Sequence, residues 1–208
     1  MTMVSDFDAA FARCPLVAIL RGVRPDEVEA IGEELVAAGF TLIEVPMNSP
    51  DPLDSVARLA KRFEGRAIIG AGTVLDTDGV AAVQAAGGTM IISPNMNPRV
   101  IAATAAAGLV SLPGIATPSE AFLALETGAT ALKLFPAEAA SPTILKAMRA
   151  VLPKTARVLP VGGITPEGMA PWTAAGAAGF GLGGALYSVG ATAEQVGANA
   201  RAFIAALG

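Results

Sequence analysis

Histidine is absent from this chain of 208 residues, and cysteine occurs once, as Cys14. The chain therefore has no Ser-His-Asp triad, no Cys-His pair and no histidine metal ligand. A single cysteine cannot form an internal disulfide and has no histidine to activate it, so we interpret Cys14 as a small buried apolar residue. Acid–base chemistry is left to carboxylates, lysine, water and the one tyrosine, Tyr187. We expect no metal and no cofactor.

Positive charge is also scarce. Lysine and arginine together number 14 against 18 acidic residues, for a formal net charge of −4. This balance argues against a nucleic-acid partner and against a polybasic membrane patch. Charge, glycine or proline interrupts the apolar runs before they reach the roughly 20 residues of a membrane helix. The acidic start lacks the features of a signal peptide. With the single cysteine, these absences predict a cytoplasmic protein.

Short apolar runs alternate with alanine-rich amphipathic segments along almost the whole chain. We predict eight strands, at 16–22, 41–47, 67–74, 89–95, 109–115, 130–137, 157–164 and 179–186. Eight helices are predicted between and after them, at 25–38, 51–63, 76–86, 98–107, 118–127, 141–152, 166–175 and 192–206. Eight such units predict an α/β fold, a closed parallel (β/α)8 TIM barrel with a short extra N-terminal helix near 5–13, as one domain over 1–208. An open doubly wound sheet is the alternative, although no Gly-x-Gly-x-x-Gly follows the first strand.

Glycine and proline mark the predicted helix ends. Ala-Ala-Gly closes four helices, at 37–39, 85–87, 106–108 and 174–176, where we expect a left-handed glycine. Proline recurs in the first helical turn, where its missing N–H has no helical partner. Thr117 and Thr165 precede two of these prolines, and we predict that both cap their helices.

One lysine stands in an apolar strand. Lys133 lies between Leu132 and Leu134, whereas the other lysines, at 61, 146 and 154, have polar or helical surroundings. A buried ammonium is costly unless it is paired, or unless its pKa falls and it loses its proton. A neutral lysine amine is the nucleophile that Schiff-base chemistry on a carbonyl substrate needs. The alternative is a strand-end lysine whose stem packs while its head reaches water.

Glu44 is the only acidic residue embedded in a strand-like apolar run. Burial raises a carboxyl pKa and a nearby amine lowers it again, so Glu44 is a candidate general base. The alternative is a structural ion pair with Lys133 or Arg21.

Functional groups of a barrel gather at the C-terminal ends of its strands. Arg21 ends the first predicted strand and can bind a carboxylate or phosphate through two hydrogen bonds. Thr73 supplies a hydroxyl between glycines that would let a ligand approach the backbone. A surface arginine and an ordinary strand threonine are the alternatives for these two residues.

Pro94 lies at the same predicted end of the fourth strand. Gly162 and Gly163 follow the core of the seventh strand, and Gly183 and Gly184 that of the eighth. Bare backbone N–H groups at these two places, beside a helix N-terminus, form a phosphate pocket in many barrels. Paired glycines can also be simple turns, but their presence on both strands favours phosphate binding.

Six stretches together closely resemble the 2-keto-3-deoxy-6-phosphogluconate/galactonate (KDPG/KDPGal) aldolase family over essentially the whole length. They are Ala18-Ile-Leu-Arg-Gly22, Glu44-Val-Pro-Met-Asn-Ser-Pro50, Ile69-Gly-Ala-Gly-Thr-Val74, Leu132-Lys-Leu-Phe-Pro136, Val161-Gly-Gly-Ile164 and Gly181-Leu-Gly183. The resemblance implies a metal-free class I aldolase, usually a homotrimer, with Lys133 as the Schiff-base lysine and Glu44 as the proton-transfer residue. It also implies that Arg21 and Thr73 contact the keto-acid end and that the glycine pairs hold the phosphate.

The stretch from Pro46 to Pro50 resembles the phosphogalactonate branch, since the phosphogluconate branch more often has arginine in place of Asn48. The segment ending at Glu138 looks more like the gluconate branch, and family members commonly carry serine in place of Gly184. We expect cleavage of 2-dehydro-3-deoxy-6-phosphogalactonate to pyruvate and D-glyceraldehyde 3-phosphate, with the phosphogluconate as the alternative substrate. A sugar-phosphate isomerase or epimerase and a non-catalytic sugar-phosphate sensor are more distant alternatives.

Overall fold

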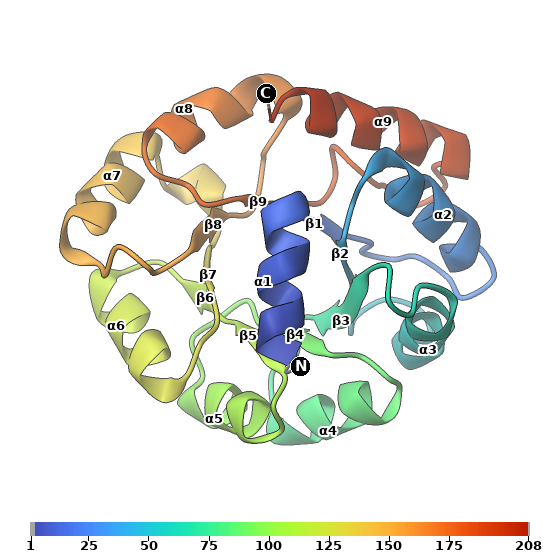
Figure 1. Ribbon diagram of the computed structural model, residues 1–208, viewed down its shortest axis with the longest axis horizontal. Helices are drawn as coiled ribbons and strands as arrows, with labels where there is room; N and C mark the ends of the chain where they lie inside the picture. The colour runs from blue at the N-terminus through green and yellow to red at the C-terminus, as the bar shows by residue number, and fades with distance from the viewer. Residues whose placement is uncertain (1–2, 208) are drawn as a thin grey trace.

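Strands and helices alternate along the computed structural model, which describes residues 3–207 (Figure 1). The strands are β1 (Leu16–Ile19), β2 (Leu42–Pro46), β3 (Ile68–Gly72), β4 (Met90–Ile92), β5 (Val110–Leu112), β6 (Gly114–Ile115), β7 (Leu132–Leu134), β8 (Val158–Pro160) and β9 (Phe180–Leu182). All paired strands run parallel. The predicted α/β class and the parallel order of the strands are confirmed.

The prediction of a closed eight-stranded barrel is wrong. The strands form a six-stranded sheet in the order β5-β4-β3-β2-β1-β9 and a separate three-stranded sheet in the order β6-β7-β8. One seam lies at Pro113, which has no N–H to donate and divides the fifth predicted strand into β5 and β6. The ladder therefore stops where a closed barrel would continue it.

The second seam lies between β8 and β9. Val161 donates its N–H to the Leu134 carbonyl of β7 at 3.0 Å. Successive N–H groups of a strand point to opposite sides, so the N–H of residue 160 would point toward β9. Residue 160 is a proline, which has no N–H to donate. Among the described residues, this seam has no continuous ladder, but an isolated bridge between Val161 and Gly181 and a hydrogen bond from the Ala178 N–H to the Val158 carbonyl at 2.9 Å.

Figure 1 shows the other helices arranged around the strands, with α1 lying across the middle of the ring. The helices are α1 (Met3–Arg13), α2 (Val28–Ala38), α3 (Pro52–Arg62), α4 (Thr77–Ala85), α5 (Pro98–Ala106), α6 (Pro118–Thr127), α7 (Pro142–Val151), α8 (Met169–Ala174) and α9 (Ala193–Ala205). Two 3-10 turns, at Ala137–Ala139 and Pro166–Gly168, complete the helical elements of residues 3–207. Each predicted helix is present, with its ends shifted by a few residues.

The predicted helix ends are confirmed at their caps. The Thr117 hydroxyl accepts the Glu120 N–H as half of a reciprocal capping box, and the Thr165 hydroxyl accepts the Gly168 N–H. The glycines of the four Ala-Ala-Gly segments all have a left-handed backbone. These local signals end one element and begin the next, which fixes the order of strands and helices.

Alternate residues along the strands pack on opposite faces. In β2, Ile43 and Val45 belong to the large outer core with the helices, whereas Leu42 belongs to a second, inner cluster. Leu132 and Leu134 of β7 likewise belong to the outer core. Side chains alternate along a strand, so Glu44 shares the inner face with Leu42, and Lys133 points inward between its two leucines.

Helix α1 covers the N-terminal ends of the strands. Its Phe7 belongs to the inner cluster. The Thr41 hydroxyl, just before β2, donates to the Ala10 carbonyl at 2.8 Å. Arg157, just before β8, donates to the Asp8 carboxylate at 2.5 Å. The inner face is therefore closed at this end, and the candidate site faces the other. Within residues 3–207, no helix is long and apolar enough to cross a membrane.

Candidate active site

Strands β2 and β7 bring Glu44 and Lys133 to one enclosed space. Glu44 is 1% exposed and Lys133 is 5% exposed. Both line a narrow cavity of about 10 Å³, about the smallest space that can hold one water molecule. The other residues that line it are largely apolar: Val17, Ile19, Ile92, Leu112, Leu159, Val161 and Gly181. The structure thus brings together the two ionisable residues that the sequence singled out.

Burial shifts the pKa of both groups. It raises the pKa of Glu44 to about 7, and the positive charges of Lys133 and Arg21 partly oppose this rise. It lowers the pKa of Lys133, which Glu44 opposes and Arg21 reinforces. A carboxyl that titrates near neutral pH is suited to proton transfer, and an amine that loses its proton more easily is a better nucleophile.

The two charged groups do not form a direct ion pair. Among the described residues, no ion pair within 4.0 Å joins Glu44 to Lys133 or to Arg21. The Glu44 Oε2 atom is buried and has no hydrogen-bond partner in that part of the chain. The structural ion pair that the sequence left open is therefore not formed, and a buried polar atom without a partner is costly unless it has a function.

Phe135 lies beside the candidate nucleophile. The Nζ atom of Lys133 is 4.8 Å from the centroid of the Phe135 ring, a cation–π distance. We did not predict this contact, although the sequence carries a signal for it. An aromatic residue two positions after the lysine lies on the same face of an extended strand.

Arg21 lies at the C-terminal end of β1 and is tied to the loop after β2. Its Nη1 donates to the Asn48 Oδ1 at 2.7 Å, and the N–H of Gly22 donates to the Ser49 hydroxyl at 2.9 Å. Arg21 and Asn48 are both exposed. The sequence predicted no contact for Asn48, whereas in the structure it accepts a hydrogen bond that orients the guanidinium.

Thr73 follows β3 directly and has a left-handed backbone, with φ at 57°. This conformation costs a β-branched residue about 1–3 kcal/mol and is concentrated at functional sites. We had expected the glycines beside it to let a ligand approach the backbone, but protein atoms occupy the places of their missing side chains. A Cβ on Gly70 would lie 1.9 Å from the Met90 carbonyl, and one on Gly72 would lie 1.4 Å from Glu44 Oε2.

The two glycine pairs differ in backbone conformation and in the atoms that lie next to them. Gly162 and Gly163 have left-handed backbones, with φ at 114° and 63°, and the Glu138 side chain packs against both. Gly183 and Gly184 lack a left-handed backbone, and a Cβ at either position would meet no atom within 4 Å. Neither backbone nor packing therefore requires glycine at 183 or 184.

The bridge between Val161 and Gly181 holds the ends of β8 and β9 side by side, so the two pairs follow neighbouring strands. Pro94 follows β4, where its carbonyl lies against Gly114. Gly114, the first residue of β6, leaves room for this carbonyl because it has no side chain.

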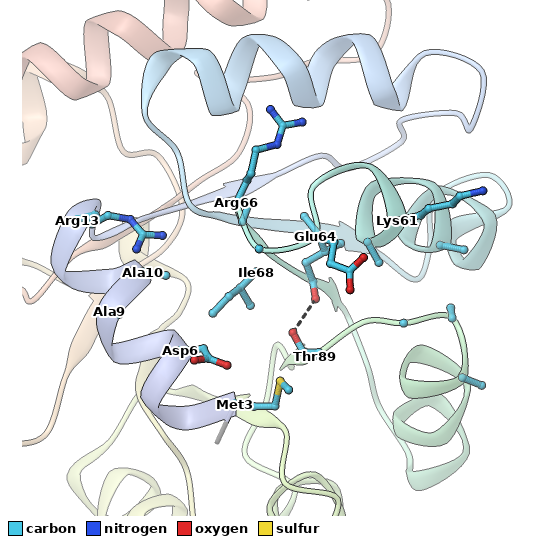
Figure 2. Close-up of a pocket in the computed structure, with 18 residues that line it drawn as sticks. Met3, Asp6, Ala9, Ala10, Arg13, Lys61, Glu64, Arg66, Ile68 and Thr89 are labelled. Atoms are coloured by element: carbon cyan, nitrogen blue, oxygen red, sulfur yellow. Dashed lines mark hydrogen bonds between the residues drawn. The ribbon is translucent and has the colours of Figure 1, made fainter. Parts of the chain in front are cut away.

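A larger groove, of about 850 Å³, lies between α1 and the segment that leads into β3 (Figure 2). Figure 2 shows Asp6 and Ile68 facing this groove. Arg13, Lys61 and other charged residues on its edge are exposed or partly exposed. None of the predicted site residues lines it, so we place the candidate active site in the smaller cavity.

Comparisons with known proteins point to one family. Residues 7–199 match the model of the KDPG and KHG aldolase family. The chain is 44% identical to the 2-dehydro-3-deoxy-6-phosphogalactonate aldolase of Escherichia coli K12, over 93% of this chain and 95% of that protein. It is also 44% identical to a solved native KDPGal structure, with a TM-score of 0.92 over 94% of this chain and 95% of the other.

A more distant relative carries a trapped intermediate. KDPG aldolase from Legionella pneumophila, solved with pyruvate captured at low pH as a covalent carbinolamine, is 27% identical with a TM-score of 0.85. That alignment covers 94% of this chain and 96% of the other. The family model spans most of the sequence, and the relative that is 44% identical matches nearly end to end. The chain therefore belongs to the KDPG and KHG aldolase family.

Proposed function

We propose that this aldolase cleaves 2-dehydro-3-deoxy-6-phosphogalactonate to pyruvate and D-glyceraldehyde 3-phosphate. The observation that carries the proposal is the buried amine of Lys133 and the buried carboxylate of Glu44 on one inner face without a direct ion pair. Two such groups can act on one bound molecule in different protonation states. The carbinolamine captured in the Legionella pneumophila relative supports a covalent route.

In the proposed reaction, the neutral amine of Lys133 attacks the C2 ketone, and loss of water gives an imine. The imine withdraws the electron pair of the C3–C4 bond, while Glu44, directly or through water, takes the proton of the C4 hydroxyl. C4 becomes the aldehyde carbon of glyceraldehyde 3-phosphate, and C3 remains in an enamine of pyruvate. Protonation at C3 and hydrolysis of the imine release pyruvate and restore the amine.

We assign substrate binding to the residues around this pair. Arg21 and Thr73 bind the keto-acid end, with Pro94 beside them, and backbone N–H groups near the two glycine pairs bind the phosphate. Arg21 supports this assignment because Asn48 accepts one of its hydrogen bonds and leaves other guanidinium N–H groups for a ligand.

We propose the phosphogalactonate rather than the phosphogluconate as the substrate for two reasons. The relative that is 44% identical is a phosphogalactonate aldolase, and the segment Pro46 to Pro50 resembles that branch. Supplying both phosphorylated substrates separately and comparing kcat/KM tests this choice. A higher kcat/KM on the phosphogluconate would reverse it. We also propose a cytoplasmic homotrimer, as the family resemblance and the composition indicate, and light scattering of the purified protein tests the assembly.

Borohydride reduction in the presence of pyruvate is the direct test of the covalent mechanism. We expect a stable adduct on Lys133, located by mass spectrometry of the peptides, and none without pyruvate. An isomerase, an epimerase or a sensor would bind a sugar phosphate without forming this adduct. Activity without an adduct would exclude the proposed mechanism.

A further inference from the structure

Gly72, the last residue of β3, lies directly against the carboxylate of Glu44. A Cβ at Gly72 would lie 1.4 Å from Oε2, 2.4 Å from Cδ and 2.8 Å from Oε1 of Glu44. These are its three nearest neighbours, so the closest conflicts of a side chain here are all with the Glu44 carboxylate. The backbone of Gly72 is not left-handed and pairs in regular register with Pro46. Backbone conformation therefore does not require glycine.

Gly70, two residues earlier, gives a contrast within the same strand. A Cβ there would lie 1.9 Å from the carbonyl oxygen and 2.6 Å from the carbonyl carbon of Met90. That conflict is with the backbone of the neighbouring strand, and no side-chain movement relieves it. The conflict at Gly72 is with one side chain, so it can be relieved when Glu44 moves. The two glycines thus serve different purposes.

Hydrogen bonds do not explain how Glu44 is held. Its Oε2 is buried and has no partner among the described residues. We infer that Gly72 is a positioning residue for the aldol cleavage: its missing side chain leaves the slot that orients the Glu44 carboxylate within the cavity it shares with Lys133. The inference rests on the proposed role of Glu44.

A slot of this kind has a chemical advantage over hydrogen-bond donors. Donors that orient a carboxylate also stabilise its charged form and lower its pKa. Packing against a bare Cα orients the group without adding such a donor. The raised pKa of Glu44, about 7, agrees with this arrangement, because burial is its largest cause.

The test is Gly72→Ala. We expect turnover to fall by about 100-fold, the loss that a displacement of ~1 Å can cause at a reacting group. The loss should appear in kcat more than in KM. Borohydride trapping of pyruvate on Lys133 should persist, and the pH profile of kcat should shift, because Glu44 moves to another environment. A merely structural defect would reduce trapping and turnover together.

The second variant is Gly72→Ala/Glu44→Asp, in which the shorter side chain withdraws the carboxylate from the new Cβ. We expect Glu44→Asp to reduce turnover less in the Gly72→Ala background than in the wild type, and to restore any thermal stability that Gly72→Ala loses. Independent, multiplicative losses would overturn the inference, as would wild-type turnover in Gly72→Ala. If pyruvate is not trapped on Lys133 and Glu44→Gln retains full turnover, it is the proposed function that fails.

Discussion

The amine of Lys133 is the one group in the proposed reaction for which no neighbour can substitute. We expect Lys133→Ala to fold, since it removes a buried polar group from an apolar strand, and to lose essentially all cleavage activity. Steady-state turnover checks this, with the exposed Lys146→Ala as the matched control. Retention of more than about a hundredth of the rate, a barrier change of only ~2.7 kcal/mol, would refute the assignment.

Glu44→Gln keeps the shape of the side chain but removes the base. We expect carbon–carbon cleavage to slow by about 100- to 10,000-fold, the usual effect of losing an acid–base group. Imine formation with pyruvate should remain detectable, so trapping and turnover should be measured on the same preparation. Unchanged turnover would move attention to Glu138, which packs against Gly162 and Gly163.

Gly184 offers a test of the phosphate site, because open space surrounds a Cβ there and the backbone is not left-handed. Serine should fit without strain, and its hydroxyl should donate one hydrogen bond to the bound phosphate. We expect Gly184→Ser to lower KM for the phosphorylated substrate by about two- to tenfold, the net value of one hydrogen bond.

Gly184→Ala is the matched control for this prediction, since it adds the Cβ without the hydroxyl. The non-phosphorylated keto-deoxy acid should show no gain with either variant. An equal gain of Gly184→Ser on both substrates would mean that residue 184 does not face the phosphate.

At the scale of the elements, the packing of α1 can be tested at the end of the strands opposite the candidate site. Phe7 is fully buried in the inner cluster, where its ring lies 5.4 Å from that of Phe11. We expect Phe7→Ala to lower the free energy of unfolding by about 3–5 kcal/mol, as for other buried phenylalanines. Urea denaturation measures the loss. The half-exposed Phe122→Ala in α6 should lose much less.

Local sequence signals predicted the elements well and their pairing less well. Threonine caps and left-handed glycines act within a few residues, so they are visible in the sequence. Closure of the sheet depends on where each N–H points after folding. Pro113 and Pro160 are plain in the sequence, but their effect on pairing follows only from the neighbours that their missing N–H groups would have faced.

The same distinction applies to the site. Glu44 and Lys133 were predictable because a charged residue in an apolar strand is an anomaly at the level of sequence. Two other features were not predictable: the contact of Gly72 with Glu44 and the hydrogen bond from Arg21 to Asn48. Both depend on the direction of a side chain across two strands, which no spacing along the chain encodes.

For the molecule as a whole, Glu44 should make folding stability depend on pH. Its pKa is about 7 in the folded state against an ordinary value of 4.5, so the folded protein binds more protons than the unfolded chain between these values. The stability that this group contributes is therefore complete below about pH 4.5 and is lost as the pH rises through about 7.

Glu44→Gln should abolish this loss, so the variant should gain stability relative to the wild type by up to ~3 kcal/mol across that range. Denaturant unfolding of both proteins at several pH values measures the difference. A constant difference between the two proteins would mean that the Glu44 carboxyl titrates normally in the folded state.

Helix α1 closes the inner face of the strands at their N-terminal end. Because Phe7 and its neighbours fill the space at this end, substrate and products must pass the opposite, C-terminal end of the strands. Under the proposed chemistry, one fragment stays tethered to Lys133 while the other is free to diffuse. The aldehyde can therefore leave while the pyruvate fragment is still bonded to Lys133, and hydrolysis then frees the pyruvate toward the same end. The covalent bond and the closed end of the strands together would then favour release of the aldehyde first.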